Sequence, residues 1–393
     1  MTKYKYAKRM NDSEPSIIRE LLKKSIEPDF ISFAGGDPDP AFFPVDELMD
    51  FEHNDAVRGN DLLFQYGISE GNHILKDELI KYMKGMGINT AENELLITSG
   101  SQQGLDLTGK LFIDEGDIVI VERPGYMGAI NAFNLYAPEF AGVGMNDDGM
   151  DMDELETILQ SGTIPKFIYT VPDFQNPTGI TMSLANRKRL LVLADEYDFL
   201  IVEDSPYYKL RFEGESIPTL KSMDTSDRVI YLGSFSKSVC PGLRIGWICA
   251  NEQLIRDYVI LKQSTDINTS ELSQLQVVSF LKHANMNSYL KKLNRAYKKK
   301  KDSILGALQD ALPESVKMTK PQGGLFVWLT LPSHIDAYKI MDRCLEQKVA
   351  VIPGTRFYVS DPQNNTIRLS YATMDEAKMH KGVEILSQII KQY

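Results

Sequence analysis

The chain has 393 residues, of which 43% are hydrophobic and 25% are charged, and its formal net charge is −11. This length suffices for one large domain and a smaller one, and the acidic balance disfavours nucleic-acid binding. No run of about 18 apolar residues is present, so we expect no membrane span.

Cysteines and histidines give no sign of metal or disulfide chemistry. The three cysteines, Cys240, Cys249 and Cys344, do not have the spacing of metal ligands. Their odd number argues against a closed disulfide framework. The N-terminal segment lacks the apolar core of a secretion signal. We therefore expect a protein of the reducing cytoplasm without a metal site.

The first predicted elements are a polar arm over residues 1–30 and a strand-like entry at Ile31–Asp37. Within the arm, Ser16–Ile26 has apolar residues at helical spacing with Arg19 between them. On the residues alone, Arg19 is a solvated helix position. Gly36 either allows close approach to a ligand or forms a simple turn.

A small-residue turn follows the strand predicted at Leu95–Thr98 and leads into a helix that ends near Phe112. Upstream, Tyr66 precedes a helix at His73–Lys84 and by itself indicates only packing. The turn leaves free backbone N–H groups where an anion can bind. The predicted phosphate cradle is Ser99, Gly100, Ser101 and Gln102. The alternative is a capped helix without a ligand.

Three further buried strands lead into polar or aromatic residues. The strands are Asp117–Val121, Lys166–Val171 and Phe199–Asp204, the last preceded by a helix at Leu184–Tyr197. In open α/β sheets, ligands bind at the carboxyl edge of such strands. The residues found there are Tyr126, Asn176, Asp204 and Tyr207. Each has an ordinary alternative as a packing, turn or capping residue.

Lys237 follows the strand Arg228–Leu232, in company with Ser234, Ser236 and Arg244. A lysine amine condenses with an aldehyde when its pKa is lowered. An arginine grips two phosphate oxygens, and serine hydroxyls donate to them. Pyridoxal phosphate carries both groups, so we predict it as the cofactor. The alternative is a surface lysine in a Ser/Gly loop.

The rest of the chain predicts a strand at Ile245–Ala250, then polar helices from about Glu252 to Leu312. Alternating strands and helices between residues 95 and 250 indicate a mostly parallel sheet with right-handed crossovers. The C-terminal elements are Gly324–Leu331, Ala337–Lys348, Val349–Pro353 and Thr366–Ala372. On the residues alone, Arg368 in the last strand forms a surface ion pair.

The segments SFSKSVCPGLRIGW, ISFAGGDPDPAFFP, SGSQQGLDL, PGYMGAI, PDFQNPTG and NTIRLSYA resemble those of the fold-type I pyridoxal-phosphate-dependent aminotransferases. The resemblance spans nearly the whole chain and is greatest to the 2-aminoadipate and kynurenine aminotransferase branch. It implies an α/β fold with a large domain and a smaller α+β domain. The large domain would contain a mostly parallel seven-stranded sheet, in which Ile245–Ala250 is the one antiparallel strand. The expected division is an arm and part of the small domain in 1–45, the large cofactor-binding domain in 46–290, and the C-terminal small domain in 291–393.

The resemblance also implies roles for single residues. Lys237 would bind the cofactor and act as the base, with Asp204 beside the ring nitrogen. Tyr207 and Asn176 would donate to the phenolic oxygen, and Tyr126 would stack on the ring. The implied phosphate contacts are Ser99, Gly100, Ser101, Gln102, Ser234, Ser236 and Arg244. The implied substrate contacts are Arg368, Asn176, Gly36 and Arg19.

These roles imply an aminotransferase that works by ping-pong chemistry in a homodimer, because Tyr66 would reach the cofactor phosphate of the partner subunit. The amino donor is left open between 2-aminoadipate, aromatic and branched aliphatic types, with 2-oxoglutarate as the expected acceptor. One alternative is a lyase or decarboxylase on the same scaffold. Another is a non-enzymatic regulator with a DNA-binding domain, which the short segment before Ile31 and the acidic charge disfavour.

Overall fold

The computed structural model describes residues 4–10, 29–49 and 61–393. The predicted amphipathic segment Ser16–Ile26, with Arg19, lies outside the described residues. Among the described residues, no helix is both long enough and apolar enough to cross a membrane.

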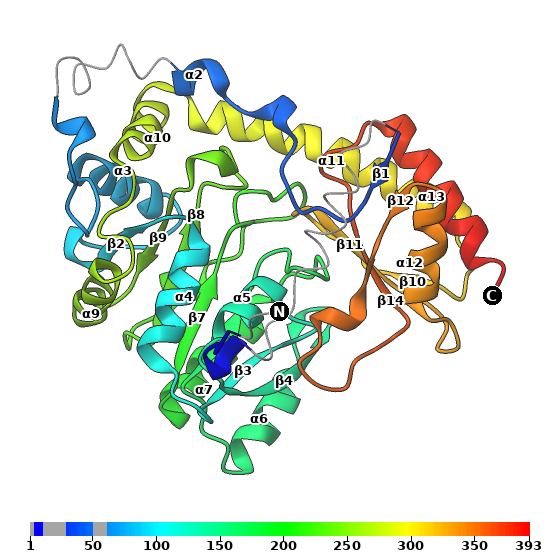
Figure 1. The fold of residues 1–393 in the computed structure, drawn as a ribbon, viewed down its shortest axis with the longest axis horizontal. Coiled ribbons are helices and arrows are strands. Elements are labelled where there is room, and N and C mark those ends of the chain that lie inside the picture. The colour runs from blue at the N-terminus through cyan, green and yellow to red at the C-terminus, as the bar shows by residue number, and fades with distance from the viewer. Residues whose placement is uncertain (1–3, 11–28, 50–60) are drawn as a thin grey trace.

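The larger part of the molecule is built on one eight-stranded sheet (Figure 1). Its strands, in spatial order, are β2 (Leu95–Thr98), β9 (Gly246–Cys249), β8 (Val229–Ser234), β7 (Leu200–Asp204), β6 (Phe167–Thr170), β3 (Ile118–Arg123), β4 (Glu139–Asn146) and β5 (Gly149–Met150). The pairs from β8 to β4 are parallel, and β9 is antiparallel to both of its neighbours.

The antiparallel placement of β9 confirms the expectation for Ile245–Ala250. The eighth strand, β5, is an addition to the expected seven. It has two residues and folds back antiparallel on β4, and its first residue, Gly149, has a φ of 113°, which a glycine adopts readily.

Both faces of the sheet are buried, as a parallel sheet requires. Val119 and Val121 enter one hydrophobic core while Ile120 between them enters another, which is the alternation of a strand covered on two sides. The covering helices are α4 (Ser101–Phe112), α5 (Met127–Asn134) and α9 (Glu252–Gln263) at the first core, and α6 (Met152–Gln160) and α7 (Leu184–Tyr197) at the second.

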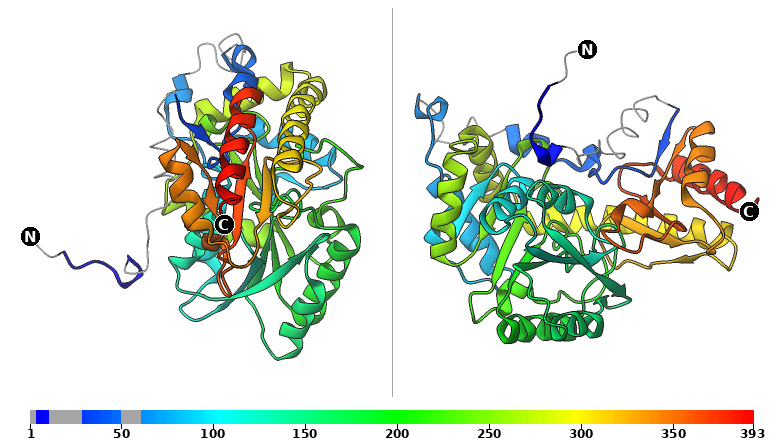
Figure 2. Two further views of the ribbon diagram at one scale, coloured as in Figure 1. Left: turned by 90° about the vertical axis from the view of Figure 1, so that its right-hand side faces the viewer. Right: turned by 60° about the horizontal axis from the view of Figure 1, so that its bottom comes forward.

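The smaller part is built on a four-stranded antiparallel sheet in the order β10 (Lys317–Met318), β11 (Phe326–Thr330), β14 (Thr366–Ser370) and β13 (Ile352–Pro353). Helices α12 (Ala337–Glu346) and α13 (Glu376–Ile390) pack with it. The segment predicted as one strand at Val349–Pro353 divides into β12 (Val349–Ala350) and β13. Strand β12 pairs instead with β1 (Ile31–Ser32), in parallel, and both views in Figure 2 show β1 beside the C-terminal elements.

One long helix, α11 (Met286–Ala311), joins the two parts. Its Leu293 and Tyr297 belong to the core of the larger part, and its Ile304 and Leu308 belong to the core of the smaller part. The remaining elements are η1 (Lys8–Met10), η2 (Pro40–Phe42), α2 (Val45–Met49), η4 (Asp61–Phe64), α3 (His73–Lys84), η5 (Glu92–Glu94), α8 (Leu220–Met223), η6 (Pro241–Leu243), α10 (Glu271–His283) and η7 (Gly354–Phe357).

Candidate active site

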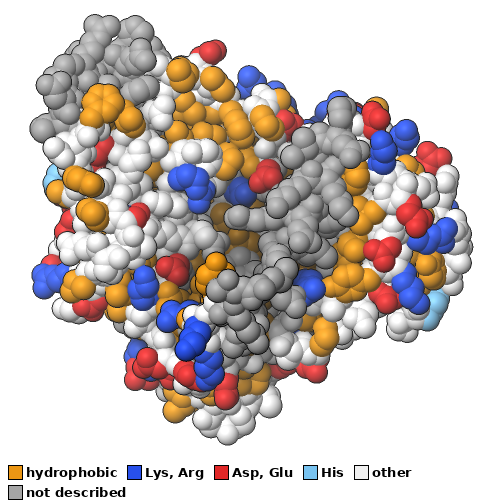
Figure 3. All heavy atoms as spheres, in the orientation of Figure 1, with side chains coloured by type: hydrophobic (Ala, Val, Ile, Leu, Met, Phe, Trp, Pro, Cys, Tyr) orange, Lys and Arg blue, Asp and Glu red, His pale blue; other side chains and the backbone are white. Residues whose placement is uncertain are grey.

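A cavity of about 620 Å³ lies where the carboxyl ends of β3, β6, β7 and β8 meet the smaller part. Figure 3 shows a hollow near the centre of the face that is turned toward the viewer. Most of the predicted site residues line the cavity: Gly36, Ser101, Gln102, Tyr126, Asn176, Asp204, Tyr207, Ser234, Ser236, Lys237, Arg244 and Arg368. Strand-end placement therefore brought together residues that are far apart in the sequence.

Lys237 lies in the turn after β8, and its Nζ donates to the carbonyl of Gly36 at 2.9 Å. Burial lowers the pKa of Lys237, and the positive charges of Arg244 and Arg368 lower it further, while Asp37 and Asp204 oppose the shift. A lowered pKa makes the neutral, nucleophilic amine more available.

Asp204 is the last residue of β7, and its Oδ2 accepts a hydrogen bond from the Tyr169 hydroxyl at 2.8 Å. Its Oδ1 is buried and has no hydrogen-bond partner among the described residues. Burial raises the pKa of Asp204 to about 7, against the effects of Tyr169 and Lys237. An N–H donor on a ring in this cavity, such as a protonated pyridine nitrogen, would satisfy the free oxygen and favour the ionised carboxylate.

The start of α4 forms one end of the cavity. Gly100 caps the helix with a φ of 79°, and a Cβ atom placed there would lie 2.4 Å from Nη2 of Arg244. Ser101 and Gln102, in the first turn, line the cavity beside the two serines of the lysine turn. Free N–H groups, hydroxyls and a guanidinium are the donors that a phosphate requires.

Ser99 lies beside the cavity and does not line it. Its hydroxyl donates to Asp266 at 3.0 Å, and its carbonyl accepts from Nη2 of Arg244 at 3.3 Å. Direct phosphate contact by Ser99 and Gly100 stays a prediction, and of the two Ser99 bonds only the one from its carbonyl contacts Arg244.

Aromatic hydroxyls line the cavity next to the carboxylate. Burial raises the pKa of Tyr126 to about 12 and the pKa of Tyr207 well above its usual range. Both side chains therefore remain protonated at neutral pH and can donate a hydrogen bond to an oxygen of a ligand.

Arg368, on β14, brings a cation from the smaller part into the cavity. Its Nη1 donates to Oδ1 of Asn176 at 3.0 Å, and its Nη2 donates to the carbonyl of Ala34. The guanidinium carbon lies 4.6 Å from the ring centre of Phe326 and 5.1 Å from that of Phe357.

Within the described residues, Arg368 has no carboxylate partner, and its buried Nε has no hydrogen bond. The prediction of a surface ion pair from the strand alone is thus wrong, because the side chain is 2% exposed. Burial lowers the pKa of Arg368 to about 10, so it remains charged at neutral pH. A buried guanidinium without an anion favours a carboxylate ligand.

Among the described residues that were predicted for the site, Tyr66 also does not line the cavity. Tyr66 is 76% exposed, away from the cavity of its own chain, and Arg19 lies outside the described residues. Conversely, Asp37 and Phe357 line the cavity without having been predicted as site residues. Asp37 is the last residue of the glycine-rich segment Ile31–Asp37, so its position next to Gly36 could have identified it from the sequence. Phe357 belongs to no motif.

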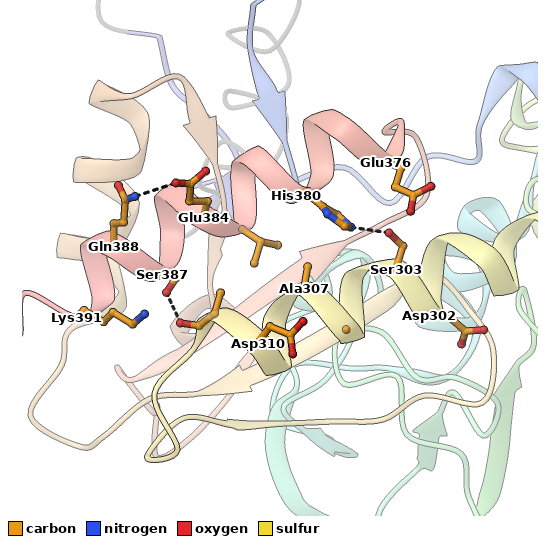
Figure 4. Close-up of a pocket in the computed structure, with 13 residues that line it drawn as sticks. Asp302, Ser303, Ala307, Asp310, Glu376, His380, Glu384, Ser387, Gln388 and Lys391 are labelled. Carbon is orange, nitrogen blue, oxygen red and sulfur yellow. Dashed lines mark hydrogen bonds between the residues drawn. The ribbon is translucent and has the colours of Figure 1, made fainter.

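A second hollow, of about 540 Å³, lies between α11 and α13 (Figure 4). Its lining includes Ser303, whose hydroxyl is 2.8 Å from Nε2 of His380, and none of the strand-end residues. Across the described chain, no group of histidine, cysteine, aspartate and glutamate side chains is arranged to hold a metal ion.

The family model described as aminotransferase class I and II matches residues 28–386 of the chain. The chain is 42% identical over 382 residues to "Aromatic-amino-acid aminotransferase 1" of Thermococcus litoralis, covering 96% of this chain and 92% of that protein.

Solved structures give the same result. The kynurenine aminotransferase of Pyrococcus horikoshii superposes with a TM-score of 0.94 at 40% identity, covering 98% of this chain and 97% of its own. The alpha-aminoadipate aminotransferase of Thermus thermophilus, complexed with N-(5'-phosphopyridoxyl)-L-leucine, superposes with a TM-score of 0.91 at 38% identity and the same coverage.

Proposed function

The chain belongs to the class I and II aminotransferases, pyridoxal-phosphate-dependent enzymes that transfer an amino group between an amino acid and a 2-oxo acid, and from this premise we propose that the cavity around Lys237 is its active site. The observation that carries the proposal is the buried Oδ1 of Asp204, which has no hydrogen-bond partner in the described part of the chain. It lines the same cavity as a lysine with a lowered pKa and a buried arginine without a carboxylate.

Each group has a role in this site. When bound, pyridoxal phosphate supplies an aldehyde for condensation with amines and a ring that stabilises the electron pair left at the substrate Cα. Asp204 would keep a proton on the ring nitrogen, and Tyr126 would stack on the ring. Asn176 and Tyr207 would donate to its phenolic oxygen. The start of α4, Ser234, Ser236 and Arg244 would hold the phosphate.

Lys237 removes the proton from the Cα of the amino acid, which a neutral amine can do and an ammonium cannot. Arg368 binds the α-carboxylate of both the amino acid and the 2-oxo acid. Its position fixes the direction of the Cα–H bond relative to the lysine, which favours proton removal over loss of the carboxylate or of a side-chain group.

For the amino donor, we propose aromatic amino acids, 2-aminoadipate and branched aliphatic amino acids, with 2-oxoglutarate as acceptor. Support comes from the names of the relatives and from the leucine adduct in one solved structure. Apolar and aromatic lining from Met127 and Phe357 suits uncharged side chains, and Arg19 is proposed to bind a distal carboxylate.

We also propose a cytoplasmic homodimer with shared sites. Tyr66 and the nearby Phe64 are 76% and 82% exposed, as expected for apolar side chains that a second subunit covers. The three cysteines are free, which fits a reducing compartment.

The test is glutamate formation from 2-oxoglutarate with a panel of phenylalanine, kynurenine, 2-aminoadipate and leucine. We expect glutamate with at least one donor, and its loss in Lys237→Ala. Release of ammonia or carbon dioxide from the donor without glutamate would instead indicate a lyase or decarboxylase.

A further inference from the structure

A buried amide and a buried carboxylate lie directly behind the cavity wall. Gln175, in the loop after β6, is 0% exposed, and Glu122, on β3, is 1% exposed. Neither side chain lines the cavity, and neither was predicted to have a role. Their contacts nevertheless join two segments that do line it.

The amide of Gln175 uses all of its hydrogen-bonding capacity. Its Nε2 donates to Oε2 of Glu122 at 3.0 Å and to the carbonyl of Pro124 at 2.8 Å. Its Oε1 accepts from the backbone N–H of Thr178 at 2.9 Å and from the Thr178 hydroxyl at 2.7 Å. In the reversed orientation, the amide oxygen would face two acceptors and the NH₂ group would face a backbone donor, so the chemistry permits only one orientation.

Glu122 holds the amide in that orientation. Its Oε1 accepts from the Thr170 hydroxyl at 2.5 Å, and the N–H of Val171 lies 3.3 and 3.4 Å from its two oxygens. The carboxylate thus ties β3 to the end of β6 and presents one oxygen to Gln175. Burial raises the pKa of Glu122 to about 7, opposed by these hydrogen bonds.

Both ends of this connection lead into the cavity. Pro124 precedes the segment that carries Tyr126, and Asn176 follows Gln175 directly. Asn176 in turn accepts from Arg368. The Gln175 amide therefore bonds the backbone of the segment that bears the tyrosine to the loop that bears the arginine's partner.

We propose that Gln175, oriented by Glu122, is a positioning residue that fixes the spacing between Tyr126 and Asn176, and through Asn176 the placement of Arg368. This inference rests on the proposed function of the cavity. It predicts that the bond network controls how well the α-carboxylate is bound and aligned, although neither residue touches the substrate.

The test is Gln175→Glu in the holoenzyme. The new carboxylate keeps the size of the side chain and both bonds from Thr178, but it turns an acceptor toward Glu122 and Pro124. We expect kcat/KM to fall at least about 100-fold, with KM raised for the amino acid and for 2-oxoglutarate alike, since both bind through a carboxylate. We also expect the visible absorption band of the bound cofactor to shift.

A swap variant provides the rescue. In the double variant Glu122→Gln/Gln175→Glu, the amide at position 122 can donate to the carboxylate at 175 while its oxygen accepts from Val171. The bond to Pro124 and the weaker of the two Val171 contacts, at 3.4 Å, are lost, and we expect kcat/KM at least about tenfold above that of Gln175→Glu. Thr178→Val is the matched control, because it removes a buried hydrogen bond to Gln175 that does not join the two segments. We expect its KM values to stay within about threefold of the unmodified enzyme.

A Gln175→Glu enzyme with full cofactor and kcat/KM within about threefold of normal would overturn the inference, as would equal KM effects in Thr178→Val. If Gln175→Glu does not fold, Glu122→Gln gives the decision, with raised KM values expected and unchanged KM values overturning the inference. Glutamate formation by the unmodified enzyme tests the proposed function separately, because the variants are read only as ratios to it.

Discussion

Asp204 and Arg368 are two buried, ionisable side chains of the cavity, and each has a polar atom without a hydrogen bond to any residue that the structure describes. Leaving a buried polar atom unpaired costs about 1–3 kcal/mol, and more when the group is charged. The two groups have opposite charges and belong to different sheets. A ligand with a ring N–H and a carboxylate would satisfy both, which explains why the folded chain tolerates them.

Glu203 precedes Asp204 on β7, but it contributes to the stability of the fold and does not line the cavity. Its two oxygens accept from the backbone N–H groups of Leu220 and Lys221 at 2.9 and 2.8 Å, and it is fully buried. Burial raises its pKa from 4.5 to about 7, although the charge of Arg187 opposes the shift. Because the folded state holds this proton more tightly, the resulting stabilisation is present below pH 4.5 and is lost as the pH rises to about 7.

Replacing Glu203 by glutamine removes that titration. We expect the free energy of unfolding of Glu203→Gln, relative to the unmodified protein, to shift in favour of the variant by up to roughly 3 kcal/mol between pH 4.5 and pH 7. Urea unfolding followed by tryptophan fluorescence at pH 5 and pH 8 measures this difference, since all other groups cancel. A difference that is constant with pH, or that moves against the variant, would contradict the assignment.

For single residues, position in the sequence predicted which side chains lie in the cavity but not their distant hydrogen-bond partners. Strand-end position predicted that Lys237, Asp204 and Asn176 would lie in one cavity, because the edge of a parallel sheet is set by topology. The hydroxyl of Ser99 bonds to Asp266, 167 positions along the chain, and no local pattern reveals that partner. The same holds for Gln175, whose role depends on a contact with Glu122, 53 positions earlier.

At the scale of elements, the start of α4 is the most constrained turn of the site. Gly100 has a positive φ and lies against Arg244. We expect Gly100→Ala to displace this guanidinium, to weaken pyridoxal phosphate binding at least about tenfold, and to lower stability by about 1 kcal/mol or more. Equilibrium titration of the apoenzyme with the cofactor measures the affinity.

Gly116 supplies the control for this variant. It has a φ of 90°, and no atom of the described residues lies within 4 Å of an added Cβ atom, so Gly116→Ala introduces the same kind of backbone strain without the collision. We expect a comparable loss of stability with unchanged cofactor affinity. Equal weakening of cofactor binding in both variants would mean that Gly100 acts through stability alone.

Local signals predicted some elements well and others not at all. Helices α3 and α7 and strand β2 have the predicted bounds, because helix caps and short apolar runs are written in the local sequence. Strand β4 was not predicted. It contains Gly142 and Gly144, which disfavour strands, and its conformation follows from six residues of pairing with β3. Helix α13 was missed although its apolar spacing and the cap at Asp375 were available.

At the scale of the whole molecule, the cavity depends on both sheets, because Lys237 follows a strand of the larger sheet and Arg368 lies on the smaller one. Pairing of β1 with β12 brings the N-terminal segment with Gly36 to the same place. The family resemblance predicted this assembly. Apolar periodicity could not have done so, since it carries no information on how two sheets meet.

The proposed dimer makes a prediction about mixed subunits. Tyr66→Ala homodimers should bind the cofactor weakly, and Lys237→Ala homodimers should be inactive. In a dimer of one subunit of each kind, the site with the intact Lys237 receives the intact Tyr66 of the other subunit. We therefore expect mixing to restore up to one native site per dimer, measured as activity at limiting cofactor. If the mixture is no more active than the Tyr66→Ala protein that it contains, Tyr66 does not contribute to the cofactor site of the partner subunit.

The central claim is that Lys237 carries the cofactor. Borohydride reduction of the holoenzyme, followed by peptide mapping with mass spectrometry, tests it most directly. We predict that the visible absorption band disappears and that the phosphopyridoxyl group is found on the peptide containing Lys237. Attachment to another lysine, or full transamination by Lys237→Ala, would contradict the account.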